Sequence, residues 1–156
     1  MKRKLLIVFL LPFLTSMSLH IETVATIDIH QNKNYLSLEI SMEDRYASYL
    51  LMYKGDCESQ IGKGLKVHKV IDKEVNVMIN GKMYKMELES TSKAKKMMKL
   101  HYIIKDVPKS IQSVKINSDM IVGTDDHAQI AVNFHLNHTL RTFKIKRDRK
   151  TIIAKY

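Results

Sequence analysis

The stretch VNVMINGKMYKMEL, residues 75–88, decides how the chain must fold. Its Asn80-Gly81 dipeptide lies between two segments that alternate apolar and polar residues, and it favours the type I′ turn of a two-residue β-hairpin, because both central residues need positive φ. The turn predicts three cross-strand pairs: Ile79–Lys82, Val77–Tyr84 and Val75–Met86. An isolated hairpin is marginally stable in water, so this one must pack a face against another sheet or helix.

Alternating apolar residues predict strands on both sides of this hairpin. Before it, residues 20–30 and 35–42 alternate and are joined by the polar segment 31–34, which indicates a second hairpin. After it, residues 90–96 are predicted to be an exposed loop and 119–126 a turn region. The remaining predicted strands are 97–105, 111–117, 127–135, 140–147 and 151–154.

One helix is predicted between the second strand and the central hairpin, over residues 43–54. There the apolar residues recur at helical spacing, and we expect this stripe to lie in the core rather than to form a stacking platform for a ligand. The stripe consists of Tyr46, Tyr49, Leu50 and Tyr53. Ser41 with Asp44 resembles a capping box, and Gly55 stands where a left-handed C-cap belongs.

The segment 57–71 is ambiguous. Ile61, Leu65, His68 and Ile71 could line one face of a second helix. Gly62 and Gly64 oppose that helix by about 1 kcal/mol each. The sequence therefore predicts an α+β fold, mostly antiparallel β, with seven to nine strands in a sandwich or curled sheet and one or two helices after the second strand.

The first 18 residues have the composition of a secretory signal peptide. Three basic residues at 2–4 precede an apolar run at 5–14, and Ser16 and Ser18 offer small residues at the −3 and −1 positions of a cleavage site. Cleavage after Leu19 is the alternative. The run is too short to span a bilayer core of roughly 30 Å. We expect residues 19–156 to form a single exported domain, periplasmic or extracellular, with no transmembrane span after cleavage.

Charge and cysteine content constrain this exported domain. Without the leader it carries 23 basic and 16 acidic residues, a net charge of +7. Cys57 is the only cysteine, so an internal disulfide is impossible and burial must hold the fold together. Cys57 is expected to be half-buried, or else to form an intermolecular bridge.

No catalytic set can be assembled from the sequence. No serine lies in a nucleophile elbow, and Cys57 lacks a local signature. We therefore expect no enzyme activity and no cofactor. A hydrolase with a site built from loops is the second alternative, and it predicts a cleft around Asp125, Asp126 and His127.

Histidines supply the first alternative, a periplasmic copper- or other metal-binding protein. The candidate ligands are His20, near the new N-terminus, and His127, His135 and His138, because imidazole suits Cu²⁺. Methionine thioethers would suit Cu(I), although methionine more often fills a core.

Two basic clusters, Lys93–Lys99 and Lys144–Lys150, suggest a partner class. No aromatic residues interleave the lysines, and an exported protein rarely meets nucleic acid, so we expect no nucleic-acid partner. Outside the cytoplasm the acidic partners are lipid phosphates, lipopolysaccharide and acidic glycans. A solvated basic face without a partner is the favoured interpretation, and an acidic envelope component or another envelope protein is the candidate partner.

Several short motifs follow the leader in a fixed order. They are HIETV at 20–24, LSLEI at 36–40, the acidic pair at 43–44, VMINGK at 77–82, the strand 111–117, DHAQI at 126–130 and RTF at 141–143. In this order the chain resembles a family of small exported proteins of unknown function from Bacteroidetes-type bacteria, whose members carry a longer helical insert before the central hairpin. The resemblance implies export and assigns no catalytic residue. Together these observations predict an exported, envelope-associated, non-catalytic binding or accessory domain.

Overall fold

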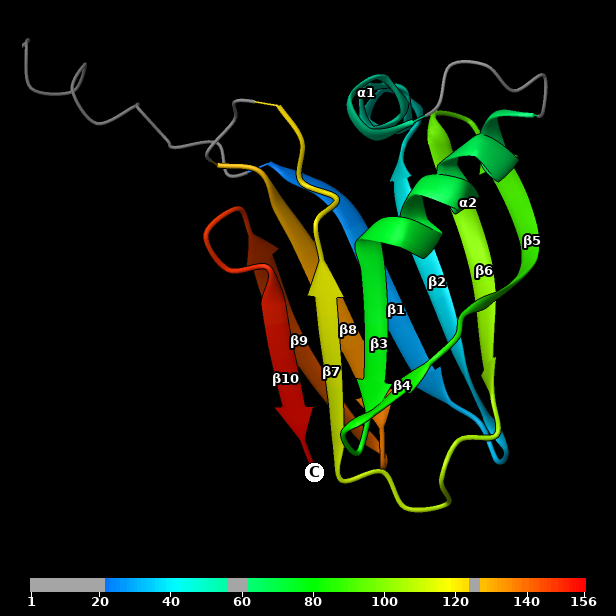
Figure 1. Ribbon diagram of the computed structural model, residues 1–156, viewed down its shortest axis with the longest axis vertical. Coiled ribbons are helices and arrows are strands. Elements are labelled where there is room, and N and C mark those ends of the chain that lie inside the picture. The colour runs from blue at the N-terminus through cyan, green and yellow to red at the C-terminus, as the bar shows by residue number, and fades with distance from the viewer. Residues whose placement is uncertain (1–21, 56–61, 124–126) are drawn as a thin grey trace, which may run out of the picture.

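A computed structural model describes residues 22–55, 62–123 and 127–156, and the predicted signal peptide lies outside them. Two β-sheets face each other; one helix lies across one end, and the other packs beside the smaller sheet and over the larger one (Figure 1). In chain order the described elements are β1 (Thr23–Gln31), β2 (Tyr35–Glu43), α1 (Asp44–Lys54), α2 (Lys63–Glu74), β3 (Val75–Ile79), β4 (Lys82–Tyr84), β5 (Glu87–Ala94), β6 (Met97–Lys105), β7 (Ser113–Ser118), β8 (Gln129–Leu136), β9 (Thr139–Lys146) and β10 (Thr151–Lys155).

The topology confirms the predicted α+β class. One sheet has the order β5-β6-β2-β1-β8-β9 and the other β10-β7-β3-β4. Neighbouring strands are antiparallel except for β1 and β8, which run parallel in the middle of the six-stranded sheet. Both helices follow the second strand, as predicted, and among the described residues no helix is long and apolar enough to cross a membrane.

The central hairpin forms with the predicted turn. Asn80 and Gly81 have φ of 49° and 83°, and the pairs Ile79–Lys82 and Val77–Tyr84 are present. The third predicted pair, with Met86, is wrong because β4 ends at Tyr84. The chain there leaves the four-stranded sheet for the other sheet, and Met86 is buried at this crossing.

Residues 90–96 are not the predicted loop, since most of them belong to β5, the edge strand paired with β6. This strand raises the number of described strands to ten. Its side chains are almost all exposed, so the strand has no apolar face from which a period of two could be recognised.

Helix α1 is present as predicted, but both of its predicted caps are wrong. Ser41 lies in β2 and donates to Glu39 Oε1 at 2.9 Å, and no side chain caps the helix start. Gly55 has φ of −89°, so it is extended rather than left-handed. A Cβ at this position would lie 2.6 Å from the backbone oxygen of Leu51, and this close approach explains the glycine.

Helix α2 forms despite its two glycines and buries a different face from the predicted one. Its buried residues are Val67, Val70 and Ile71. Of the predicted face, only Ile71 is buried, while Leu65 is exposed and Ile61 lies outside the described residues. The helix contacts β3, β5 and β6, so it covers sheet surface beyond the edge of the four-stranded sheet.

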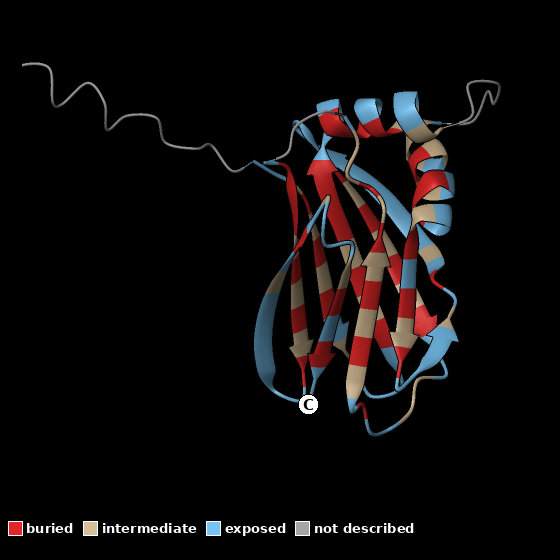
Figure 2. Ribbon diagram, turned by 60° about the vertical axis from the view of Figure 1, so that its left-hand side comes forward, coloured by how far each residue is buried: buried red, intermediate tan, exposed pale blue. Residues whose placement is uncertain are grey.

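The core lies between the two sheets, where the buried residues form alternating bands along the strands (Figure 2). The alternation predicted for β1, β2 and β6 is confirmed, with Ile27, Leu38 and Leu100 among the fully buried side chains. The opposite side of the six-stranded sheet carries polar side chains. The packed core therefore fixes which residues reach that outer face.

Candidate functional site

Of the predicted histidine ligands, His135 and His138 line the same hollow, whereas His127 lies away from them at the other end of β8. His20, Cys57, Asp125 and Asp126 lie outside the described residues. His127 precedes β8, whereas His135 lies near the end of that strand. The six strand residues between the two histidines span about 20 Å. Among residues 22–55, 62–123 and 127–156, no three His, Cys, Asp or Glu side chains are arranged to hold a metal ion.

A different histidine pair appears instead. The parallel register of β1 and β8 places His30 opposite His135, and their rings stack with centroids 4.2 Å apart and planes 9° from parallel. The sequence does not indicate this pair, because it depends on a long-range parallel pairing. The expectation that methionine fills the core holds for Met42, Met86, Met98 and Met120, whereas Met52, Met83 and Met97 are exposed.

The α1 tyrosines provide a more enclosed candidate site. Tyr46 and Leu50 are buried as predicted, but the prediction is wrong for Tyr49 and Tyr53, which are 45% and 58% exposed. The helix lies at the end of the sandwich, so only a narrow stripe of its surface reaches the core. The two exposed rings, four residues apart on one helix face, line a pocket of about 340 Å³.

We call this the tyrosine pocket, and its wall combines aromatic, charged and small apolar side chains. They are Glu22, Thr23, Val24, Glu43, Arg45, Tyr46, Tyr49, Tyr53, Val122, Gly123 and Ala128. Tyr46 is fixed because its buried hydroxyl donates to the Met120 carbonyl oxygen at 2.7 Å. The Arg45 guanidinium carbon lies 5.9 Å from the Tyr49 ring centroid, within cation–π range. The pocket thus offers flat apolar surfaces beside a few hydrogen-bonding groups.

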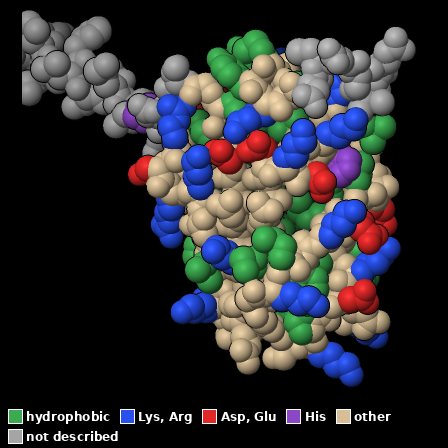
Figure 3. All heavy atoms as spheres, viewed as in Figure 1, with side chains coloured by type: hydrophobic (Ala, Val, Ile, Leu, Met, Phe, Trp, Pro, Cys, Tyr) green, Lys and Arg blue, Asp and Glu red, His purple; other side chains and the backbone are tan. Residues whose placement is uncertain are grey.

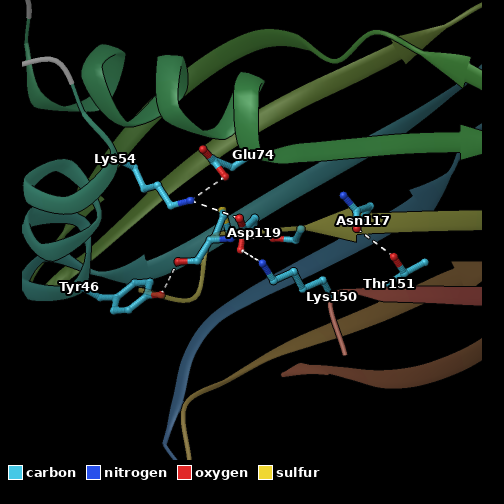
Figure 4. Close-up of polar contacts among 9 residues, drawn as sticks. Tyr46, Lys54, Glu74, Asn117, Asp119, Lys150 and Thr151 are labelled. Atoms are coloured by element: carbon cyan, nitrogen blue, oxygen red, sulfur yellow. Dashed lines mark hydrogen bonds and ion pairs between the residues drawn. The ribbon is translucent and has the colours of Figure 1, made fainter. Parts of the chain in front are cut away.

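An ion network ties together the elements next to this pocket (Figure 4). Lys54 Nζ, in the last turn of α1, lies 3.2 Å from Glu74 Oε2 and 3.3 Å from Asp119 Oδ2. Asp119 Oδ1 in turn lies 2.7 Å from Lys150 Nζ. Alternating charges therefore connect both helices with the segments that follow β7 and precede β10.

The network perturbs the protonation of its members. The hydrogen bond from Lys150 lowers the pKa of the Asp119 carboxyl, burial opposes this, and Lys54 lowers it further. For Lys54, burial lowers the pKa, but hydrogen bonds to Glu74 and Asp119 outweigh burial and raise it overall. The folded state therefore favours the charged forms of both groups.

The Asp119→Asn variant is expected to lose about 1 kcal/mol of unfolding free energy at pH 7, a modest value because the Asp119 side chain is 38% exposed. Because the folded-state pKa is lowered, the carboxylate stabilises the fold above its unfolded pKa of about 3.9, and this contribution disappears as pH falls through the folded pKa. Urea unfolding at pH 7 and at pH 3 should show the difference between variant and parent shrinking at pH 3.

Asp148→Asn serves as the matched control, because Asp148 is exposed in a turn and its replacement should change stability little at either pH. If the unfolding free energies of the parent and of Asp119→Asn differed as much at pH 3 as at pH 7, the ionised carboxylate would not stabilise the fold.

The two basic clusters do not form one surface. Residues 93–99 lie at the β5–β6 edge of the six-stranded sheet and residues 144–150 at the β9 edge. Several of these cations are paired, including Lys93 with Asp44 at 3.0 Å and Lys99 with Glu39 at 2.7 Å. Figure 3 shows the same mixing of Lys, Arg, Asp and Glu on one face of the molecule.

A basic hollow of about 500 Å³ remains at β9. Lys144, Lys146 and Arg149 line it together with a single carboxylate, that of Asp148. Three cations against one anion make this hollow the described surface best suited to an acidic partner.

In comparisons with known proteins, no family model matches this chain, and no curated protein matches it. The candidate sites rest on the geometry alone, and they are the tyrosine pocket, the β9 hollow and the His30–His135 pair.

Proposed function

We propose that this protein is an exported, envelope-associated binding domain, and that the tyrosine pocket is its ligand-binding site. The observation that carries the proposal is the exposure of Tyr49 and Tyr53 at the pocket. Aromatic rings on a helix with a buried stripe usually join the core, but these two face a volume of about 340 Å³. Small-molecule sites commonly occupy about 300–1,000 Å³ and combine aromatic walls with a few polar groups.

The lining favours a neutral ligand that is rich in hydroxyl groups. The Glu22 and Glu43 carboxylates can accept hydrogen bonds from a ligand and Arg45 can donate them, while Val24 and Val122 offer apolar contact. Two carboxylates against one guanidinium disfavour an anion. A sugar ring fits this description, because it has polar edges and can lie flat on a tyrosine face. We therefore propose a neutral envelope glycan as the ligand class.

Binding of this kind needs hydrogen bonds and stacking, and the proposal includes no catalytic step. The hydrolase alternative depends on Asp125 and Asp126, outside the described residues, and it stays a prediction. An acidic envelope component would meet Lys144 and Lys146 at the β9 hollow instead. The same titrations can separate these two surfaces.

Titration with neutral oligosaccharides of glucose, mannose and N-acetylglucosamine, and with heparin as an acidic glycan, tests the proposal. The chain has seven tyrosines and no tryptophan, so tyrosine fluorescence can report on the pocket. Tyr53→Ala should weaken binding of a neutral oligosaccharide by roughly two- to tenfold, since an aromatic contact contributes about 0.5–1.5 kcal/mol.

Tyr35→Ala is the matched control, because Tyr35 is 39% exposed at the opposite end of β2 from α1. Its affinity should equal that of the parent. Absence of binding, or unchanged affinity in a Tyr49→Ala/Tyr53→Ala double variant, would refute the tyrosine pocket. Heparin binding that is lost in Lys146→Ala would move the function to the β9 hollow.

A further inference from the structure

A second site lies at the other end of β1, on the outer face of the six-stranded sheet. Strand β1 begins beside the tyrosine pocket at Thr23 and reaches His30 about 23 Å further on. Ile29 and Phe134 face the core, so His30 and His135, the residues that follow them, point outward. Both imidazoles are therefore accessible from outside without unfolding.

The stacked rings keep their nitrogen atoms available. Within residues 22–55, 62–123 and 127–156, the rings of His30, His135 and His138 make no hydrogen bond or ion pair through a ring nitrogen. The contact between His30 and His135 is face to face, which leaves the nitrogen lone pairs in the ring planes unused. The ring nitrogens of this pair are therefore available to an external ligand.

The third histidine opens into the same space. A hollow of about 710 Å³ is lined by His30, His135 and His138 together with the neighbouring loop residues. His138 belongs to the two-residue turn between β8 and β9, where Asn137 and His138 have φ of 50° and 60°. The backbone N–H of Asn137 donates to Gln31 Oε1 at 2.9 Å, so the turn is held against the end of β1.

The dimensions suit a transition-metal ion. A ligating imidazole nitrogen lies about 2.0–2.1 Å from zinc, so two nitrogens that share an ion can be at most about 4.2 Å apart. Rings stacked at 4.2 Å bring the two imidazoles within that range, but their planes are only 9° from parallel and their in-plane lone pairs run side by side. At least one ring therefore has to rotate out of the stack so that both nitrogens converge on one ion. His138 has to turn toward the pair, because no three potential ligands in the described part of the chain already stand in ligating positions.

The donor set selects the class of ion. The hollow contains three imidazoles and Lys33 but no carboxylate. Hard cations such as Mg²⁺ and Ca²⁺ require oxygen ligands, whereas neutral imidazole suits Zn²⁺, Cu²⁺ and Ni²⁺. We propose that His30 and His135, with His138 as a third ligand, form a binding site for a divalent transition-metal ion. The proposal is independent of ligand binding in the tyrosine pocket.

Titration of the purified chain with zinc sulfate, followed by calorimetry and by NMR of the imidazole resonances, tests this site. We expect one zinc ion per chain. His30→Ala and His135→Ala should each weaken binding by more than about tenfold, which is one decade of Kd or ~1.4 kcal/mol, and His138→Ala should weaken it less. The resonances of His30 and His135 should shift together on zinc addition.

Two control variants separate this site from other histidines. His101→Ala removes another outer-face histidine, one paired with Glu39 at 3.5 Å, and His20→Ala removes the candidate near the N-terminus. Both should bind zinc like the parent. Because His30 is exposed, His30→Gln offers a second variant if His135→Ala fails to fold. The proposal is overturned by absence of saturable binding, by unchanged affinity in His30→Gln, or by a loss confined to His20→Ala.

Discussion

Replacing Phe134 with alanine is expected to lower the free energy of unfolding by about 3–5 kcal/mol. Phe134 lies on β8 with none of its surface exposed, and its ring meets that of Phe143 edge to face, with centroids 5.7 Å apart and planes at 84°. Truncation removes buried apolar surface and leaves a cavity that the surrounding strands cannot close, since β8 is held between β1 and β9.

Urea-induced unfolding, followed by far-UV circular dichroism, measures this loss. Phe143→Ala is the natural comparison, because Phe143 is only half-buried and its truncation should cost less. The double variant should reveal a coupling of about 0.5–1.5 kcal/mol between the rings. Equal losses for the two single variants would show that β8 does not lie deeper in the core than β9.

The strands could be predicted because their signal is local. Residues 35–42 and 97–105 alternate apolar and polar side chains along most of their length, and burial in β2 and β6 follows that alternation. Asn80-Gly81 fixed the central hairpin through the positive φ values that its turn requires. Asn137-His138 forms a similar turn with two positive φ values, so backbone chemistry within a few residues sets both reversals.

The misplaced elements share a different cause. Strand β5 is polar on both faces, because the strand lies at a sheet edge, and an exposed strand needs no apolar period. Tyr49 and Tyr53 continue the apolar stripe of α1, yet they pass beyond the end of the sandwich and stay exposed. A period of 3.6 residues identifies the helix, but it does not indicate how much of that helix contacts the β-sandwich.

The candidate sites were the least predictable part of the molecule. His30 and His135 meet only because β1 and β8 pair in parallel, and the sequence between them contains no feature that sets this register. The tyrosine pocket likewise joins α1 to Val24 and Ala128, at the starts of strands far away in sequence. The sequence identified histidines as candidate ligands and a tyrosine stripe on one helix. Which of these residues are neighbours depends on strand pairing between segments distant in sequence.

Tyr46 contributes both to the stability of the fold and to the wall of the proposed binding site. Its side chain is 9% exposed, lines the tyrosine pocket and donates to the Met120 carbonyl oxygen at 2.7 Å. Tyr46→Ala is expected to lower the free energy of unfolding by about 3–4 kcal/mol, because it removes a buried ring that holds α1 to the sandwich. Tyr46→Phe should cost about 1–2 kcal/mol, because it leaves the carbonyl without its donor.

The unfolding free energies of these variants and of Tyr53→Ala, measured in urea at pH 7, provide the comparison. Tyr53 is 58% exposed on the same helix, so its truncation should change stability by no more than about 0.5 kcal/mol. Tyr53→Ala should therefore lose ligand with the fold intact, whereas Tyr46→Phe should lose stability and keep the ring that lines the pocket. If Tyr53→Ala lost as much unfolding free energy as Tyr46→Phe, Tyr53 would be packed against the protein and the proposed pocket would not be open.

Alkaline pH gives an independent test of the Tyr46 hydroxyl. Burial raises the pKa of Tyr46 to about 12, above the value of about 10 expected in the unfolded chain. Because the folded-state pKa is raised, the neutral phenol contributes its full stabilisation below pH 10, and that contribution is lost as pH rises from about 10 toward 12. Tyr46→Phe has no proton to lose there, so the stability gap between parent and variant should narrow between pH 8 and pH 11. A constant gap over that range would mean that the hydroxyl reaches solvent, and α1 would then have to sit less tightly over Met120 than its 2.7 Å hydrogen bond requires.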